Sequence, residues 1–416
     1  MKQNRLTNRE QYICYVLFVL EPVLAWLGVP GHLAVASSLF VLLGIYYVQF
    51  KGFRNILTSL PLSIWLFLTV YHCGNAMMKH VSGVDYVDLL HGLKIYFCIA
   101  IFAYWAEIDL ERTIKFLYKC FCVYLIVVFV LCGGFNGGRL SGVVYATQIG
   151  QTAAVATFFG ACLAFFKRQS SARFISYIII PFIVALLAQS RNSMAMMALI
   201  VIGYFAADSF RKGMRVFRVL KICFILLLGM VVFALIAYNS PLYQRALSKK
   251  EESANSYYMK KNSSGTVFDL IVGDRLVYYV EGWKFFLSSP VTGIGMWGFR
   301  EKYGGDYPLH SEYMVHLCEG GLIAFSLWLL FLCCCVKNIY RIKFERGYRL
   351  LLLSGMVQFL FCGIYAREFF YEFFYPMIAM FLVNPSKVQK QFLLCGIDCK
   401  ELDAKKSGDE IKDLRE

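Results

Sequence analysis

Long apolar segments alternate with short polar segments along most of the chain. A helix that crosses a bilayer needs about 20 mostly apolar residues. By this criterion we expect twelve membrane-spanning helices. They cover residues 11–29, 32–50, 56–74, 86–105, 114–133, 147–166, 174–189, 193–210, 219–238, 311–336, 350–366 and 369–384. The pattern therefore predicts an all-α, polytopic membrane bundle.

One long polar segment interrupts this alternation and divides the chain. We expect an N-terminal transmembrane bundle over 1–238, an extracytoplasmic loop over 239–309, C-terminal transmembrane helices over 310–384 and a cytoplasmic tail over 385–416. Within the loop, residues 276–287 are rich in aromatic and aliphatic side chains and predict a short amphipathic helix that lies on the membrane or caps the bundle. The tail alternates Lys with Asp and Glu, which favours a solvated segment.

Composition excludes a soluble protein. Of 416 residues, 59% are hydrophobic and 17% are charged, whereas soluble domains carry about 25% charged residues. The net charge of +15 could indicate nucleic-acid binding, but the basic residues stand in short clusters between apolar runs. Such clusters indicate membrane topology, so we expect no nucleic-acid partner.

The same clusters orient the chain. Most basic residues of the short loops fall on one side of the predicted spans, and the opposite short loops hold only Lys79, Arg139, Arg191 and Arg367. By the positive-inside rule both termini are cytoplasmic and the 239–309 loop is extracytoplasmic. Arg139 and Arg191 therefore run against the topological trend and call for another explanation.

The 15 cysteines do not indicate disulfides or zinc. Most lie inside apolar runs, where cysteine behaves as a small buried hydrophobe. The 239–309 loop contains none, and no Cys/His spacing suits a zinc site. We expect no metal site.

Candidate chemistry gathers on the outer face at four places, 137–142, 189–193, 273–275 and 310–313. Arg191 stands among Ser190, Asn192 and Ser193 where a helix begins, and a helix N-terminus next to a guanidinium can bind an anion. Arg275 opens the predicted amphipathic helix, which would hold it near the headgroup level. His310 is the residue with a pKa naturally close to neutrality at the mouth of a span, and it suits a general base.

Other polar and glycine patterns are less specific. Gly293, Gly295 and Gly298 match GxGxxG, but a dinucleotide site needs a βαβ unit, so we expect a tight turn with close backbone approach. Asp88, His91 and Lys94 share a helix face and suit either a proton path or a structural polar seam. His72, His80 and His91 have no predicted cluster of arginines beside them and favour a structural role, whereas His316 could face the bundle interior.

The ordered set of outer motifs resembles the O-antigen ligase and O-antigen polymerase superfamily. The motifs fall within about residues 130–330. They are Arg139-x-Ser-Gly142, Ser190-Arg191, Asp274-Arg275, Pro290-x-x-Gly-x-Gly295-x-x-x-Phe299, His310-x-x-Tyr313 and Glu319-x-Gly321. Ser311 departs from the family pattern, because relatives commonly carry Asn there.

The resemblance implies a GT-C-like membrane glycosyltransferase in the bacterial cytoplasmic membrane, with its active site on the periplasmic or outer face. Its partners would be the bilayer, an undecaprenyl-diphosphate-linked oligosaccharide and other polysaccharide-assembly proteins such as a flippase and a chain-length regulator. No cofactor, nucleotide sugar or metal is implied. Catalytic roles fall to His310, Arg191 and Arg275. Substrate-binding roles are assigned to Arg139, Ser190, Tyr313, Glu319 and Trp297, although Trp297 suits a sugar-stacking role and an interfacial anchor equally.

Three functions remain open, namely a polymerase, a ligase and a transporter. A polymerase joins lipid-linked repeat units of O-antigen, capsule or exopolysaccharide, whereas a ligase moves the glycan to lipid A-core or another acceptor. We favour the polymerase because Arg139 adds to the basic outer face. A transporter or flippase is the second alternative; it would predict inverted repeats and broken helices in matched positions, and the sequence contains no convincing internal repeat.

Overall fold

The computed structural model describes residues 8–50, 54–81, 86–131, 135–136, 139–140, 144–188, 190–212, 275–303, 309–343, 345–365 and 374–394. These residues form an α-helical bundle with one small β-hairpin. The N-terminal elements are α1 (Asn8–Trp26), α2 (His32–Phe50), α3 (Arg54–Leu57), α4 (Leu60–Met78), α5 (Tyr86–Ile108), α6 (Leu110–Leu131), β1 (Phe135–Asn136), β2 (Arg139–Leu140), α7 (Ala146–Phe166), α8 (Ser171–Leu187) and α9 (Arg191–Arg211). The C-terminal elements are α14 (Arg275–Ser288), α15 (Gly298–Tyr303), α16 (Glu312–Met314), a π-helix (Val315–Glu319), α17 (Gly321–Tyr340), α18 (Arg346–Tyr365), α19 (Tyr375–Leu382) and α20 (Pro385–Leu394). The all-helical membrane architecture predicted from hydropathy is confirmed in this coarse form.

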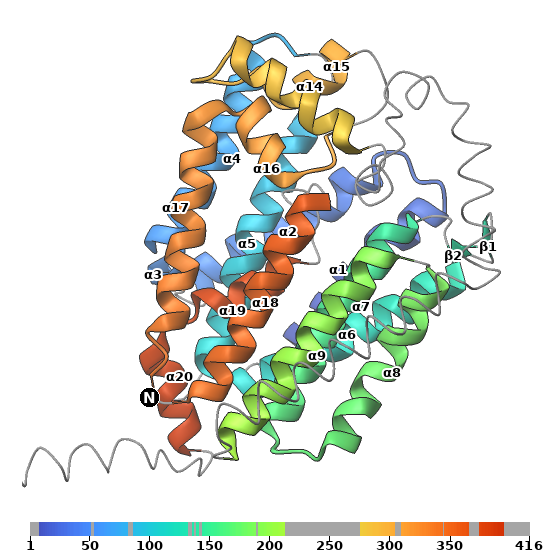
Figure 1. Ribbon diagram of the computed structural model, residues 1–416, viewed down its shortest axis with the longest axis vertical. Coiled ribbons are helices and arrows are strands. Elements are labelled where there is room, and N and C mark those ends of the chain that lie inside the picture. The colour runs from blue at the N-terminus through green and yellow to red at the C-terminus, as the bar shows by residue number, and fades with distance from the viewer. Residues whose placement is uncertain are drawn as a thin grey trace, which may run out of the picture.

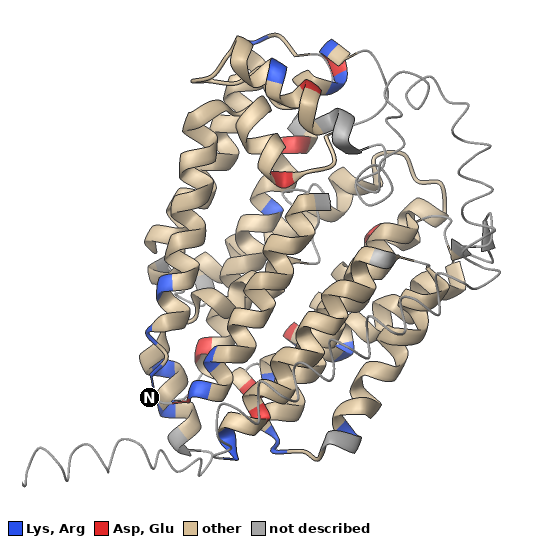
Figure 2. Cartoon of the chain, viewed as in Figure 1, with Lys and Arg blue, Asp and Glu red and all other residues tan. Residues whose placement is uncertain are grey.

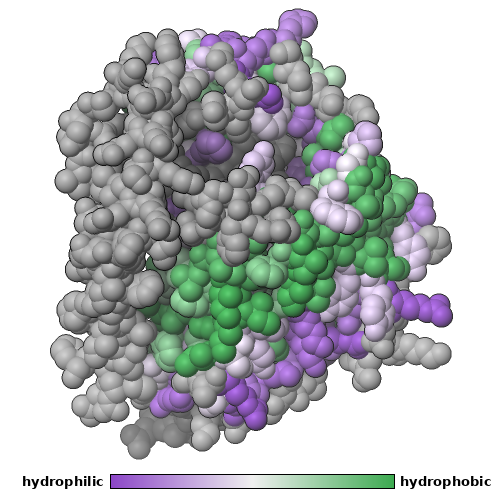
Figure 3. Space-filling view, turned by 90° about the vertical axis from the view of Figure 1, so that its right-hand side faces the viewer, coloured by the Kyte–Doolittle hydropathy of each residue, from purple (hydrophilic) through white to green (hydrophobic). Residues whose placement is uncertain are grey.

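Among the described helices, seven are long and apolar enough to cross a membrane, namely α2, α5, α6, α7, α9, α17 and α18. The predicted number of twelve stays a prediction, partly because the span expected over 219–238 lies outside the described residues. The space-filling view shows a broad apolar band on one side of the molecule, bounded below by hydrophilic residues (Figure 3). Such a band suits contact with lipid tails.

Helix α7 forms the centre of one half of the bundle. From Ile149 to Phe166 every residue of α7 is buried, and α6, α8 and α9 pack around it (Figure 1). Its sequence is rich in Ala and Gly, and small residues let membrane helices approach closely. Helix α18 packs along α9 and joins this half to the group that contains α4, α5 and α17.

The two ends of the bundle differ in charge. Lys and Arg residues gather at the end where α9, α17 and α20 have their last or first turns, and we name it the basic end (Figure 2). Helices α14, α15 and α16 lie across the opposite end, which we name the loop end (Figure 1). The positive-inside rule predicts that the basic end faces the cytoplasm.

Part of the predicted tail is helical. The expectation of a solvated segment from residue 385 differs from the structure over α20, which packs at the basic end. Phe392 is buried against Phe166, with ring centroids 4.5 Å apart, and Gln391 bonds the α5–α6 turn at Ala106 O and Leu110 N. Val388 and Phe392, four residues apart, supply the short apolar face that anchors it. Residues 395–416 lie outside the described residues.

The span expected over 311–336 is also interrupted. The helix stops at Glu319 and starts again at Gly321, and the 290–295 loop bonds both broken ends. Ile294 N and Gly295 N donate to Cys318 O and Glu319 O at 3.0 and 2.9 Å. Leu322 N donates to Pro290 O at 2.9 Å. A helix can break at this depth because protein groups replace the missing helical bonds.

Two glycines allow the 290–295 loop to pass close to the backbone of the helix break. Gly293 has φ 70°, and a Cβ there would meet Glu319 O at 2.4 Å; Gly321 has φ 67°, and its Cβ would meet Val291 O at 2.3 Å. The turn and close backbone approach expected for the glycine-rich segment are therefore present, and they need no nucleotide.

Gly293→Ala is expected to destabilise the protein by at least about 2 kcal/mol, because it adds positive-φ strain to a backbone clash. The measurement is the thermal unfolding midpoint of the purified protein in detergent. Gly74→Ala in α4 is the matched control, since its Cβ would meet nothing within 4 Å and Ala favours a helix. Equal midpoints for the two variants would contradict the close packing of the 290–295 loop against the helix break.

Candidate functional site at the loop end

A small separate core organises the loop end. Ile294, Phe299, Leu309, Met314 and Cys318 are buried together. Helix α14 covers this core, since a Cβ on Gly282 would approach Met314 Cε at 2.8 Å and Leu309 Cδ2 at 3.6 Å. The core fixes the segment that carries His310, a half-buried residue directly after Leu309.

The outer face of α14 is apolar. Val280, Trp283 and Leu287 are 46%, 49% and 60% exposed. They recur at helical spacing on one face, opposite the buried Gly282 and Phe286. The short amphipathic helix expected over 276–287 thus exists and combines a face against the protein with a face suited to the membrane interface.

The last turns of α18 connect the elements that carry the predicted catalytic residues. The Tyr313 hydroxyl donates to Leu360 O at 3.0 Å, and the Tyr279 hydroxyl on α14 donates to Ile364 O. Helix α9, whose first residue is Arg191, packs along α18 in the antiparallel sense, with Gly203 against Ser354. The starts of α9 and α16 and one side of α14 therefore meet the same end of α18.

A buried hydrogen-bonded chain lies beneath this end. His316 Nε2 lies 3.0 Å from Glu312 Oε1, and His316 Nδ1 lies 3.0 Å from His72 Nε2 on α4. Their exposed fractions are 0%, 1% and 1% for His316, Glu312 and His72. With Glu312 ionised, both bonds run in one direction, because each imidazole donates from Nε2 toward the carboxylate. We name Glu312, His316 and His72 the buried relay; such a chain can hold tautomers fixed or accept a proton.

Helix α4 also binds the broken backbone directly. Asn75 Nδ2 donates to Thr292 O at 2.6 Å and Glu319 O at 3.2 Å. The Tyr71 hydroxyl donates to Gly320 O at 3.1 Å. With His72, these residues form one polar turn of α4 that holds both sides of the helix break.

Trp297 is placed by a strained backbone and one hydrogen bond. Its φ is 64°, which for a bulky residue costs roughly 1–3 kcal/mol and is held by the surroundings. The indole N–H donates to Asp88 Oδ1 at 3.1 Å. One aromatic residue of the predicted site is therefore fixed to α5, and part of its surface remains accessible.

Ser190 and Arg191 begin α9. Ser190 is buried, its Oγ lies 2.6 Å from Ser193 Oγ, and both serines pack on Gly150 of α7. A Cβ at Gly150 would meet Ser193 Oγ at 2.4 Å. Close contact of α7 and α9 thus fixes the backbone position of Arg191.

The remaining predicted residues are only partly described. Arg139 lies in β2 and pairs in register with Asn136, and Arg275 is the first residue of α14. The side chains of Arg139, Arg191 and Arg275 lie outside the described part of the chain, so their roles stay predictions. Glu319 is fully buried at the end of the π-helix, and the half-buried Tyr313 stacks edge-on against Trp328 with centroids 5.0 Å apart.

Sequence reasoning missed the buried relay. The structural role expected for His72 named no partner, and the structure supplies one, because His316 bonds it across 244 positions of sequence separation. His316 does face the bundle interior, as expected. The spacing of Glu312 and His316 by four residues was a visible signal, whereas the partner on α4 requires tertiary structure.

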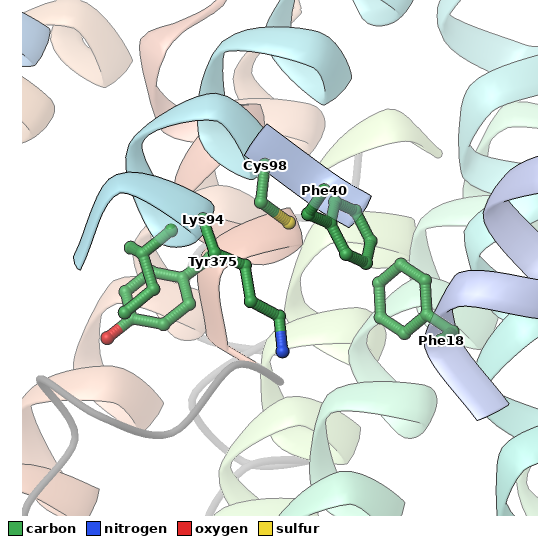
Figure 4. Close-up of a pocket in the computed structure, with 6 residues that line it drawn as sticks. Phe18, Phe40, Lys94, Cys98 and Tyr375 are labelled. Carbon is green, nitrogen blue, oxygen red and sulfur yellow. The ribbon is translucent and has the colours of Figure 1, made fainter. Parts of the chain in front are cut away.

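The polar face of α5 has separate partners along its length. Asp88 bonds Trp297, and Lys94 Nζ lies 3.1 Å from Glu21 Oε2 on α1. Lys94 also borders a cavity of about 10 Å³ with Phe18, Phe40, Cys98 and Tyr375 (Figure 4), which is room for about one water molecule. These contacts favour the structural interpretation of Asp88 and Lys94 over a continuous proton path. Within the described residues, no group of three His, Cys, Asp or Glu side chains is arranged to hold a metal ion.

Comparison with known proteins finds a family match for the part of the chain that includes the loop end. No curated protein matches the chain. Residues 175–329 match the model of a family described as O-antigen ligase. The matched segment runs from α8 into α17 and includes Ser190, Arg191, Arg275 and His310. This match supports a relationship of the region to the O-antigen ligase and polymerase superfamily, whose members are glycosyltransferase-like enzymes.

Proposed function

We propose that this protein transfers a glycan from an undecaprenyl-diphosphate carrier at the outer face of the cytoplasmic membrane. The observation that carries the proposal is the family match over residues 175–329, because it spans the elements that meet at the end of α18. The placement of α14 at the loop end, away from the basic end, supports an outer site.

The residue types suit this reaction. Negative charge builds on the diphosphate oxygens as the glycosidic bond breaks, and guanidinium groups stabilise such charge through bidentate hydrogen bonds. We assign this task to Arg191 and Arg275. The acceptor hydroxyl loses a proton as it attacks, and we assign the uptake of this proton to His310, which lies between the buried Leu309 and α16. A pair of catalytic carboxylates of the glycosidase kind is not needed, because diphosphate is already a good leaving group.

We further propose that the glycan is polymerised, with O-antigen, capsule or exopolysaccharide repeat units as both donor and acceptor. Arg139 supports this choice, since it adds a basic residue beside the start of α7. The alternative is ligation to lipid A-core or another acceptor, which is the activity named in the matched family description.

The test is incubation of the purified protein with lipid-linked oligosaccharide, alone and with candidate acceptors. A ladder of longer glycans from the donor alone supports polymerisation, and transfer only to a second acceptor supports ligation. Movement of the donor across vesicles without any transfer would contradict both and favour a flippase.

His310→Ala is expected to lower the transfer rate by about 100-fold or more at every pH, because general-base catalysis contributes roughly 10²–10⁴-fold. Product formation is followed by gel separation of the glycans. His80→Ala is the control, since His80 follows the end of α4 and its side chain is exposed rather than packed in the hydrophobic core. A parental rate in His310→Ala would leave His310 with a structural role.

A further inference from the structure

A pocket opens between α1 and α6 at the basic end, opposite the loop-end site. Its volume is about 350 Å³, and its lining comes from two helices: Gln11, Tyr12 and Tyr15 on α1, and Arg112, Lys115, Phe116 and Lys119 on α6. The rings of Tyr15 and Phe116 meet edge-on with centroids 4.7 Å apart. The two helices thus share an aromatic contact beneath a rim of cations.

The cations of this pocket share one face of α6. Residues 112, 115 and 119 recur at helical spacing, and no carboxylate belongs to the described lining. Within the described part of the chain, Lys115 and Lys119 make no ion pair. Both lysines are exposed, so their charges are available to a ligand.

The neighbouring carboxylates have other partners. Asp109 Oδ1 accepts the backbone N–H of Arg112 at 3.0 Å. Glu111 lies 3.9 Å from Lys167, and Glu10 bonds the Tyr47 hydroxyl on α2. The pocket therefore keeps an excess of positive charge.

A buried donor adds a second requirement. Gln11 Nε2 is inaccessible to solvent and has no hydrogen-bond acceptor among the described residues. Burying such a group without an acceptor is costly. An anion with several oxygens, such as a phosphate, would supply acceptors to the lysines, and to this amide once the Gln11 side chain turns toward the pocket.

The same face of α6 becomes apolar beyond the pocket. Val123, Ile126 and Val130 follow at helical spacing and are 41%, 50% and 67% exposed. Lys119 lies nine residues from the start of α6, roughly 14 Å along the axis, and lysines at this depth reach toward the interface. Cations at the membrane boundary followed by an exposed apolar stripe match the headgroup and acyl chains of a phospholipid.

We propose that this pocket binds the phosphate-bearing headgroup of an anionic phospholipid in the leaflet at the basic end, with its acyl chains along the exposed stripe of α6. Juxtamembrane basic residues are drawn to anionic lipid, and basic pockets between membrane helices at this side hold such headgroups. This site is separate from the loop end, so it stands independently of the proposed transferase function.

Native mass spectrometry of the purified full-length protein tests the proposal, with phosphatidylglycerol and phosphatidylcholine as probes in a neutral detergent. The parent protein is expected to retain phosphatidylglycerol in preference to phosphatidylcholine. The double variant Lys115→Gln/Lys119→Gln is expected to bind phosphatidylglycerol at least about 10-fold more weakly, since each lysine contributes to attraction of anionic lipid. Lys115→Arg/Lys119→Arg is expected to retain it.

The matched control is Lys343→Gln/Lys390→Gln, which removes the same charge from two exposed positions elsewhere at the basic end. It is expected to bind phosphatidylglycerol like the parent protein. An equal loss in this control, or equal retention of phosphatidylcholine by the parent protein, overturns the proposal. Saturable binding of inorganic phosphate that displaces the lipid would assign the pocket to a soluble anion and overturn it as well. Unfolding midpoints close to the parent value in each variant establish that the comparison concerns folded protein.

Discussion

Arg275→Ala is expected to lower glycan transfer by at least about 100-fold, and Arg191→Ala by a similar factor. Removing one preorganised donor from developing negative charge typically costs about 10²–10³ in rate. Arg275→Lys is expected to recover only part of the activity, because an ammonium cannot make the bidentate bond of a guanidinium to phosphate. The measurement is the initial rate of transfer from a lipid-diphosphate-linked oligosaccharide by each purified variant.

The control for this pair is Arg300→Ala. Arg300 lies on α15 at the same end of the molecule and is exposed, so its removal alters the local charge equally. It is expected to change the rate by less than about threefold, as for surface charges in general. A near-parental rate in Arg275→Ala, or an equal loss in Arg300→Ala, would remove the diphosphate clamp from the account.

His316→Ala is expected to destabilise the protein by roughly 3–5 kcal/mol, the usual range for breaking a buried, hydrogen-bonded pair. The substitution removes the imidazole that bonds both Glu312 and His72, and it leaves space beside Trp328, whose ring centroid lies 5.1 Å away. Because the buried relay begins two residues after His310, transfer activity is expected to fall with stability. The measurements are the thermal unfolding midpoint in detergent and the transfer rate.

A graded series separates the relay from general packing. His72→Ala is expected to destabilise less than His316→Ala, because the Glu312–His316 bond remains. His80→Asn at the exposed end of α4 is expected to leave the midpoint unchanged, since Asn tolerates the φ of 54° found at that position. Parental stability in His316→Ala would show that the relay contributes nothing to the loop end.

The helical architecture could be read from the sequence because hydropathy and helix length act locally. The apolar runs located α2, α5, α6, α7, α9 and α18, and the aromatic stretch after Arg275 located α14. The glycine-rich segment at 293–298 was also interpreted correctly, because positive-φ turns depend mainly on the residue itself.

Features that depend on distant contacts could not be predicted. The stop before α17 requires Gly295 to bond Glu319 and Pro290 to bond Leu322, and no local sequence pattern reports contacts between residues so far apart in the chain. The His72–His316 bond joins α4 to the π-helix and depends on which helices are neighbours. Helix α20 looked polar because, among its described residues, Val388 and Phe392 supply the buried apolar face.

The candidate site was predicted as a set of residues rather than as a geometry. His310, Tyr313 and Glu319 lie on one segment, so their proximity follows from the sequence. The meeting of α9, α14 and α16 at α18 comes from packing contacts such as Tyr313 to Leu360 and Gly203 to Ser354. Those contacts could not be deduced from one sequence.

The central claim is that the loop end holds the diphosphate of a lipid-linked glycan between Arg191 and Arg275, beside His310. The most direct test is an experimental structure of the protein in a lipid nanodisc with a bound undecaprenyl-diphosphate-linked oligosaccharide. We predict that the diphosphate oxygens lie within hydrogen-bonding distance of both guanidinium groups, with the His310 imidazole facing the acceptor side of the anomeric carbon. A diphosphate bound elsewhere, or contacting neither arginine, would contradict the account.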